Sequence, residues 1–178
     1  MVIQQKGFDI MVDFKKISPQ QIVENPFKLI GGDWGLVTAG TPEKLNTMTV
    51  SWGGVGIMWN KPVVYIFIRP QRYTIEFLER EENFTLSFYP DEYRKALGFC
   101  GSRSGRDVDK IEATGFTPAF AENGAPYFEQ AKLVLCCKKL YGQFLNEESV
   151  IAGETVLPNY NGDYHKMYIG EITEVLAK

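Results

Sequence analysis

The alternation of apolar and polar positions predicts a chain built mainly of short strands. Trp34–Ala39 and Thr47–Trp52 are rich in strand-favouring residues, and the turn-forming segment Gly40–Pro42 closes the first of them, which predicts a hairpin. Val63–Ile68 is an unbroken apolar run, the pattern of a central strand covered on both faces. Three further strands are predicted later in the chain, over Phe84–Tyr89, Ala131–Tyr141 and Tyr164–Val175.

Short helices are predicted between these strands. Ser18 followed by proline opens a helix over Gln20–Glu24, and Thr74 caps a helix that runs through Glu82. Further segments are predicted as a helix that begins at Asp91 and ends near Cys100–Gly105, a helix over Asp107–Thr114 and a mobile loop over Glu147–Asp163. Six or more strands with so few crossovers predict a mainly β protein, an antiparallel sheet or barrel with short helices.

Length and charge limit the function classes. A chain of 178 residues fits one domain over 1–178, and folding at this size hides roughly 70% of the unfolded chain's surface. The net charge is −3, from 19 Lys and Arg against 22 Asp and Glu. A chain with this balance has no overall positive field to hold a polyanion, so we expect no nucleic-acid partner.

Several kinds of site are excluded by the residues present. His165 is the one histidine of the chain, which rules out a two-histidine metal motif within one chain, and there is no Cys-x-x-Cys, so no metal site is expected. Gly53–Gly56 lacks the third glycine of a dinucleotide fingerprint, and no phosphate loop ends in Gly-Lys-Ser/Thr.

The cysteines and the apolar runs bear on location. Cys100, Cys136 and Cys137 are few and odd in number, which fits a reducing compartment, and buried structural thiols are expected for all three. Met1–Asp13 offers no uninterrupted signal-peptide core, and no window approaches eighteen apolar residues. A cytoplasmic protein without a membrane span is therefore expected.

Three segments hold more hydroxyls, glycines and cations than folding requires. In the first, Asn46–Gly53, small polar side chains on a strand can lie beneath a flat heteroaromatic ring such as a flavin while backbone groups bond its edge; alternatively, Thr and Ser simply face water. In the second, Arg69–Thr74, two arginines meet the start of a helix and can form a phosphate site, although Thr74 is also explained as a plain N-cap. In the third, Ser102–Lys110, hydroxyls, loosened amides and a lysine can converge on an anion, or form a solvated turn.

The order of these motifs resembles one family. Asn46–Gly53, Lys61-Pro62, Arg69–Thr74 and Cys100–Lys110, with the closing stretch Asp163–Glu171, are similar to the flavin reductase domain family in its flavoredoxin-like branch. The likeness spans about residues 27 to 175, and four motifs in order are more specific than any one. The resemblance implies a six-stranded antiparallel FMN-binding split barrel of Greek-key type, usually a homodimer with FMN at the subunit interface.

Site residues follow from the resemblance position by position. His165 sits where the family often has a histidine near the flavin face, which makes it the candidate catalytic residue; it is also explained as a strand histidine packed against its neighbours. The residues implied around the isoalloxazine ring and the ribityl phosphate are Asn46, Met48, Thr49, Val50, Ser51, Trp52, Arg69, Arg72, Tyr73, Thr74, Ser102, Ser104, Gly105 and Lys110.

The function implied is reduction of FMN, or of an acceptor through bound FMN, by NADH or NADPH. The hydride chemistry belongs to the cofactors, and the protein supplies position, hydrogen bonds and water exclusion. The Glu147–Asp163 loop, with Tyr160 and Tyr164, is a hypothetical cover for the nicotinamide. One alternative is an FMN-loaded electron carrier that serves a redox protein partner and has no nicotinamide site. Another is a split-barrel module with a different ligand or none.

Overall fold

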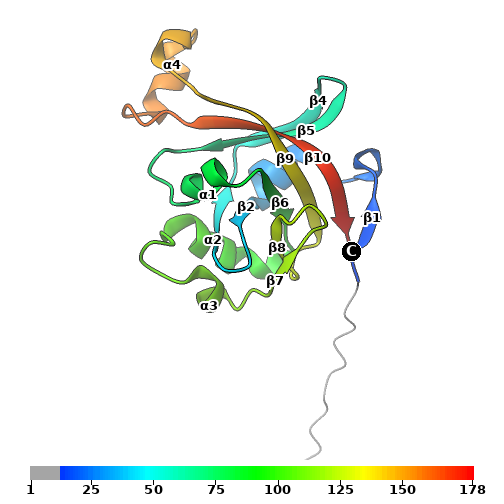
Figure 1. The fold of residues 1–178 in the computed structure, drawn as a ribbon. Coiled ribbons are helices and arrows are strands. Elements are labelled where there is room, and N and C mark those ends of the chain that lie inside the picture. The colour runs from blue at the N-terminus through cyan, green and yellow to red at the C-terminus, as the bar shows by residue number, and fades with distance from the viewer. Residues whose placement is uncertain (1–12) are drawn as a thin grey trace, which may run out of the picture.

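The computed structural model describes residues 13–178 (Figure 1), so the expectation about a leader in Met1–Asp13 lies almost wholly outside the described residues. These residues form ten strands: β1 Lys15–Ile17, β2 Gly35–Gly40, β3 Leu45–Val50, β4 Gly53–Met58, β5 Lys61–Ile68, β6 Asn83–Phe88, β7 Pro118–Phe120, β8 Pro126–Phe128, β9 Leu133–Phe144 and β10 Lys166–Ala177. The α-helices are α1 Thr74–Arg80, α2 Arg94–Ser102, α3 Lys110–Thr114 and α4 Gly153–Val156. A π-helix spans Lys28–Asp33, and single 3-10 turns span Pro19–Gln21, Asp91–Tyr93, Glu147–Ser149 and Leu157–Asn159.

One antiparallel sheet dominates the molecule. Its strands follow the order β3-β2-β6-β9-β10-β5-β4, β1 pairs with β10, and β7 pairs separately with β8. The mainly β, antiparallel prediction is therefore confirmed, whereas the count of six strands is wrong, because eight strands join the main sheet. The run Val63–Ile68 lies in β5, one strand from the end of this path, so it is not central as predicted.

The sheet is curled so that its two ends meet. β3 and β4 lie at opposite ends of the hydrogen-bonded path, yet only Ser51 and Trp52 separate them in the chain. Gly53, which begins β4, has a φ of +153°, and a Cβ there would lie 2.5 Å from the carbonyl oxygen of Tyr65. The predicted strand Thr47–Trp52 consequently stops at Val50, and Ser51 and Trp52 form the corner that joins the two edges.

Two hydrophobic clusters hold this barrel together. Side chains along one strand alternate between the faces of the sheet, so neighbouring residues enter different clusters. In β2, Val37 points into the barrel interior with Phe84, while Leu36 joins Leu97 of α2 and Phe128 outside it. α2 thereby covers the outer side of β2 and β3, while α1 contacts the same two strands and adds Phe77 and Leu78 to the interior cluster (Figure 1).

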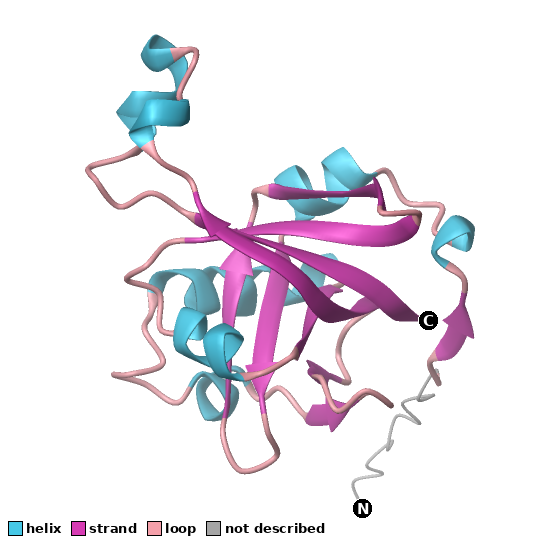
Figure 2. Ribbon diagram, turned by 45° about the horizontal axis from the view of Figure 1, so that its top comes forward, coloured by secondary structure: helices cyan, strands magenta, loops and turns pink. Residues whose placement is uncertain are grey.

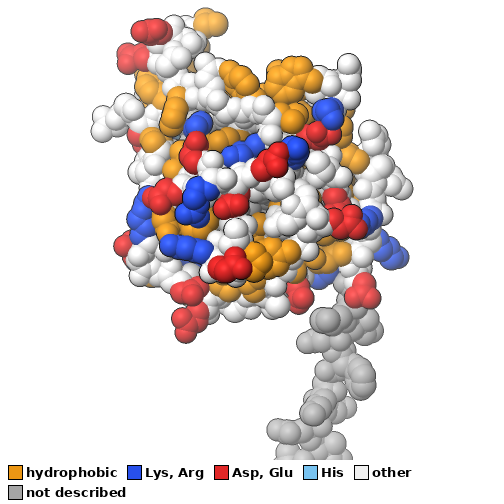
Figure 3. All heavy atoms as spheres, viewed as in Figure 1, with side chains coloured by type: hydrophobic (Ala, Val, Ile, Leu, Met, Phe, Trp, Pro, Cys, Tyr) orange, Lys and Arg blue, Asp and Glu red, His pale blue; other side chains and the backbone are white. Residues whose placement is uncertain are grey.

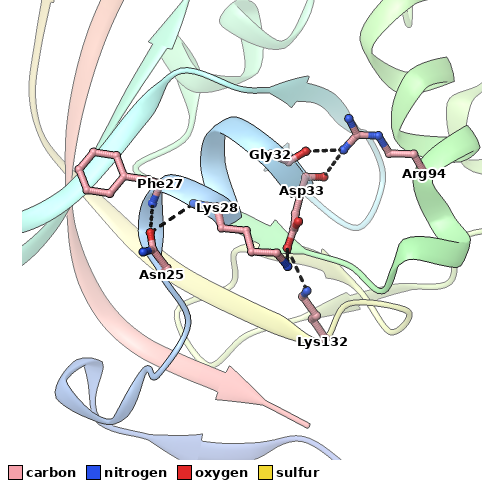
Figure 4. Close-up of polar contacts among 7 residues, drawn as sticks. All are labelled: Asn25, Phe27, Lys28, Gly32, Asp33, Arg94 and Lys132. Atoms are coloured by element: carbon pink, nitrogen blue, oxygen red, sulfur yellow. Dashed lines mark hydrogen bonds and ion pairs between the residues drawn. The ribbon is translucent and has the colours of Figure 1, made fainter.

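A polar network fixes the segment before β2. Arg94 of α2 donates to the carbonyl oxygens of Gly32 and Asp33, at 2.7 and 2.8 Å, and the carboxylate of Asp33 meets Lys28 and Lys132 (Figure 4). This network binds the π-helix to α2 and to the start of β9.

The helix boundaries differ from the predictions at several points. The predicted helix Gln20–Glu24 is a single 3-10 turn, and the one predicted from Asp107 begins only at Lys110, where the Asp109 side chain accepts two backbone N–H bonds. The predicted mobile loop Glu147–Asp163 contains two 3-10 turns and α4, all short. Because each is only one turn long, the sequence gives them little helical periodicity.

This helical segment lies at the end of a long arm. β9 and β10 are each twelve residues long, and their distant ends carry the segment away from the barrel (Figure 2). We call residues 145–164 the extension.

None of the helices in residues 13–178 has the length and apolar content needed to cross a membrane. Figure 3 shows acidic and basic side chains interspersed on one face of the molecule.

Candidate functional site

Two neighbouring clefts bring the sequence-predicted residues together at the corner between β3 and β4. The first, which we call the Trp52 cleft, has a volume of about 270 Å³ and is lined by Met48, Thr49, Val50, Ser51, Trp52, Phe67, Arg69, Arg72 and His165. The second, the Ser104 cleft, has about 120 Å³ and is lined by Gln71, Arg72, Tyr73, Thr74, Ser102, Arg103, Ser104, Gly105 and Lys110. Arg72 belongs to both, and every predicted site residue except Asn46 lines one or the other.

The end of β3 and the corner form one wall of the Trp52 cleft. Trp52 is 47% exposed, while Met48 and Val50 are buried. The Thr49 hydroxyl donates to the carbonyl oxygen of Leu97 in α2, so this side chain fastens the strand to the helix and does not point freely into the cleft. The wall therefore offers an exposed indole and backbone groups, a surface suited to a flat ring.

His165 lies across from Trp52. The two ring centroids are 5.1 Å apart with a tilt of 47°, and His165 Nδ1 is 3.0 Å from the Tyr160 hydroxyl of the extension. Burial and the nearby Arg69 lower the pKa of His165 below its usual value of 6.5. The imidazole is therefore neutral at neutral pH and can give or accept one hydrogen bond.

Arg69 lines the Trp52 cleft rather than the Ser104 cleft, although the sequence placed it beside a phosphate. Its guanidinium forms an ion pair with Asp163 and donates to the carbonyl oxygen of Asn159 at 2.7 Å. A backbone bond from Asn161, a bond from Gln71 and the contact with Arg69 together hold the pKa of Asp163 well below its usual range. Arg69 therefore fastens the extension to the barrel.

Arg72 differs from the other cations of the site. Its Nη2 atom is buried and has no hydrogen-bond partner among residues 13–178, and burial lowers its pKa. A guanidinium carries five N–H donors and stays charged in proteins, so an unbonded buried donor is costly. Arg72 lines both clefts, and its positive charge suits an anionic group bound in the Ser104 cleft.

Thr74 and Gly105 line the Ser104 cleft, and Asn46 lies directly behind them. The side chain of Asn46 is buried and donates to the Thr74 hydroxyl at 2.8 Å. Thr74 is itself buried in the first turn of α1, and Tyr73 is the capping residue, so the prediction of Thr74 as the N-cap is wrong. A Cβ at Gly105 would lie 2.1 Å from Asn46 Oδ1, which explains why glycine stands there.

Lys110 is buried and hydrogen-bonded within the chain, which its position in the sequence did not indicate. The side chain is 5% exposed, and its ammonium donates to the carbonyl oxygens of Thr47 at 2.7 Å and Cys100 at 2.8 Å. Burial lowers the pKa of Lys110 to about 8. Lys110 thus ties β3 to α2 and retains one N–H donor for a ligand.

The serines of the second cleft lie at the end of α2 and in the turn after it. The hydroxyl of Ser102 contacts the carbonyl oxygen of Phe99 at 3.4 Å, and that of Ser104 accepts from the backbone N–H of Arg106 at 3.2 Å. The Ser104 hydroxyl hydrogen is left for a ligand.

Some residues that line the two clefts could not be recognised from the sequence. Phe67 belongs to the apolar run that reads as core, and Gln71 carries no pattern of its own, although it donates to Asp163 at 2.9 Å.

All three cysteines are free and buried, as predicted, and burial raises the pKa of Cys100 to about 11 and of Cys136 to about 12.

Comparisons with known proteins agree with this architecture. Residues 28–178 match the sequence model of a family described as "Flavin reductase like domain". The fold is similar to an FMN-binding protein from Thermus thermophilus solved with p-hydroxybenzaldehyde, at 22% identity over 92% of this chain and 82% of that chain, with a TM-score of 0.66. It is also similar to flavoredoxin from Methanosarcina acetivorans, at 21% identity over 92% and 75%, with a TM-score of 0.65.

A third similar structure is an NADH:FAD oxidoreductase from Streptomyces globisporus in complex with NAD and FAD fragments. It is 19% identical over 80% of this chain and 73% of that chain, with a TM-score of 0.58. At such identities the likeness shows the fold, and the split barrel that the motif order implied is confirmed. Comparison with curated proteins finds no match.

Proposed function

The chain belongs to the flavin reductase like domain family, and from this we propose that it binds FMN and reduces flavin, or an acceptor through bound FMN, at the expense of NADH or NADPH. The observation that carries the proposal is Arg72, which lines both clefts and whose buried Nη2 atom has no partner among residues 13–178. An anion beside this cation would give its donor a partner, and FMN brings one phosphate attached to a flat ring.

The two clefts fit the two ends of FMN. The Trp52 cleft is the wider one and exposes an aromatic surface, so it would hold the isoalloxazine ring. The Ser104 cleft is narrower and combines hydroxyls with Arg72 and the remaining donor of Lys110, so it would hold the phosphate. The shared Arg72 lets one ligand span both clefts.

When bound, FMN supplies the redox chemistry by accepting a hydride from a reduced nicotinamide. The protein's own task is to position and to exclude water. The neutral imidazole of His165, oriented by the Tyr160 hydroxyl, would contribute one hydrogen bond at the open side of the Trp52 cleft. His165 is therefore the residue we assign to substrate orientation.

The extension is the segment we assign to covering the nicotinamide. Tyr160 stacks on Tyr164 with ring centroids 4.5 Å apart and reaches His165, so the aromatic end of the extension meets the Trp52 cleft. Deleting residues 147–160, which removes Tyr160, should weaken nicotinamide binding and leave FMN affinity unchanged. An unchanged nicotinamide affinity would contradict this role.

A homodimer is part of the proposal, with FMN at the subunit interface. β4 is a terminal strand of the sheet, and it exposes Val55 and Ile57, with Trp59 in the turn that follows. Hydrophobic side chains gather over this hairpin at the upper edge of Figure 3. Ile57→Glu should shift the protein towards the monomer in light scattering.

We also place the protein in the cytoplasm, because its cysteines are all free.

One experiment tests the redox role. The purified protein is loaded with FMN, its absorption spectrum is recorded, and it is mixed anaerobically with NADH or NADPH in a stopped-flow instrument. Rapid bleaching of the flavin band is expected with at least one of them. An FMN-loaded protein indifferent to both would be the electron carrier, and a protein that takes up no FMN would refute the whole proposal.

A further inference from the structure

A third cavity adjoins the Ser104 cleft. This cavity, which we call the Lys44 cavity, has a volume of about 510 Å³ and is lined by polar and apolar residues of the β2–β3 turn, of the loop before α3 and of the first turn of α3. It shares Tyr73, Gly105 and Lys110 with the Ser104 cleft. A ligand that extends past one phosphate in this direction would have to enter the Lys44 cavity.

Arg106 lines the Lys44 cavity and packs on Tyr73, which lines both this cavity and the Ser104 cleft. Arg106 donates from Nη1 to the carbonyl oxygen of Gln71 at 3.2 Å and forms an ion pair with Glu76 of α1. Its guanidinium carbon also lies 4.7 Å from the centre of the Tyr73 ring. Arg106 therefore bridges the loop after α2 to the segment before α1, and Gly105 packs closely against Asn46 beneath it.

Arg106 is not placed as a phosphate ligand. It lines the Lys44 cavity and not the Ser104 cleft, and its charge is matched by the Glu76 carboxylate. Arg72 has the opposite arrangement, with a donor that has no partner among residues 13–178. The two arginines consequently have separate roles. Arg72 is available to bind an anion, and Arg106 closes the Ser104 cleft on the side of the Lys44 cavity.

We propose that the Arg106–Glu76 bridge ends the cofactor site after one phosphate and makes it select a monophosphate flavin over a dinucleotide flavin. This inference rests on the proposed FMN function and adds its specificity. A flavin with a diphosphate and an adenosine would have to displace Arg106 from Glu76, Tyr73 and the carbonyl of Gln71 at once. Specificity then arises from a barrier against the longer ligand and not from added contacts to the shorter one.

The test is a titration of the flavin-free protein with FMN, FAD and riboflavin by calorimetry. Losing a surface ion pair and a cation–π contact predicts that FAD binds the wild-type protein about 10- to 100-fold more weakly than FMN. In Arg106→Ala the gap should shrink to about threefold or less because FAD binds more tightly. Glu76→Gln, which keeps the length of the side chain, should shift the ratio in the same direction.

Arg80→Ala is the matched control. Arg80 lies on α1 as Glu76 does, its guanidinium carbon is 4.8 Å from the Phe77 ring centre, and its Nε is 3.9 Å from the Glu81 carboxylate. This variant should keep the wild-type ratio of FMN to FAD affinity. If Arg106→Ala does not fold by circular dichroism, Glu76→Gln carries the test.

The outcomes separate the two proposals. Equal wild-type affinities for FMN and FAD would overturn the bridge as a barrier while leaving the FMN function standing. An Arg106→Ala variant that loses FMN and FAD in parallel would show that Arg106 is a ligand, which also overturns the inference. Failure of the wild-type protein to bind any flavin would refute the proposed function and this inference together.

Discussion

Replacing Arg72 by methionine should weaken FMN binding without harming the fold. Methionine keeps an unbranched apolar stem of similar reach and removes the charge. The Nη2 donor would form a charge-assisted hydrogen bond to the phosphate, and such bonds contribute about 1.5–3 kcal/mol. Loss of one should raise the Kd for FMN about 10- to 150-fold. Riboflavin has no phosphate, so its Kd should change by no more than about twofold.

The flavin-free variant should be as stable as the wild-type protein or more stable. Most substitutions at half-buried positions cost about 0.5–3 kcal/mol of unfolding free energy. Arg72→Met instead removes a buried donor that has no partner among residues 13–178, and this donor costs free energy in the absence of a ligand. Urea denaturation of the flavin-free proteins measures the difference, and calorimetry with FMN and riboflavin measures the affinities.

Arg80→Met controls for the loss of a cation and a stem. It should leave both flavin affinities unchanged, because Arg80 lies on the exposed side of α1 and lines neither cleft. The reasoning is refuted if Arg72→Met lowers the unfolding free energy by more than about 1 kcal/mol and weakens FMN and riboflavin equally. Arg72 would then support the fold rather than the phosphate.

Four further outcomes are expected. Lys110→Met should lower the unfolding free energy by at least about 2 kcal/mol in urea, because two carbonyl oxygens lose their donor; an effect below about 0.5 kcal/mol would contradict this. Gly105→Ala should weaken FMN in calorimetry, whereas Gly98→Ala, whose new methyl would meet nothing within 4 Å, should not. Asp163→Asn should speed proteolysis of the extension, because a charged partner is lost; an unchanged rate would refute the anchor. Because the pKa of His165 is lowered in the folded protein, the unfolded state binds more protons just below pH 6.5, so stability should rise with pH there and His165→Asn should flatten that slope.

The sequence predicted the composition of the site better than its geometry. Hydroxyls and cations in Asn46–Gly53, Arg69–Thr74 and Ser102–Lys110 marked the segments that the structure brings to one corner. Their side-chain partners could not be foreseen, because each depends on contacts between distant segments. Lys110, for example, is held by a carbonyl from β3 and another from α2, which only the folded chain places together.

Glycine explains why β4 and the corner before it were not predicted. Three of the six residues of β4 are glycines, Gly53, Gly54 and Gly56, which disfavour a strand despite Val55 and Ile57, and pairing with β5 holds the segment extended. The corner at Gly53 was missed for the same reason, since its backbone is dictated by the close carbonyl of Tyr65. Apolar alternation predicts which residues face a core, but it does not say where a sheet will bend to close.

The arrangement of cations follows from how the barrel closes. The corner between β3 and β4 has no strand-to-strand hydrogen bonds to hold it, so side chains and neighbouring segments must hold it instead. Lys110 and Thr49 fasten β3 to α2, and Arg69 fastens the extension, so these groups are satisfied within the chain. Arg72 is the exception at this corner, because its buried Nη2 donor has no hydrogen-bond partner among residues 13–178. The other donors at this corner bond to groups of the chain itself. A buried charged donor without such a partner is best explained by a ligand that binds there.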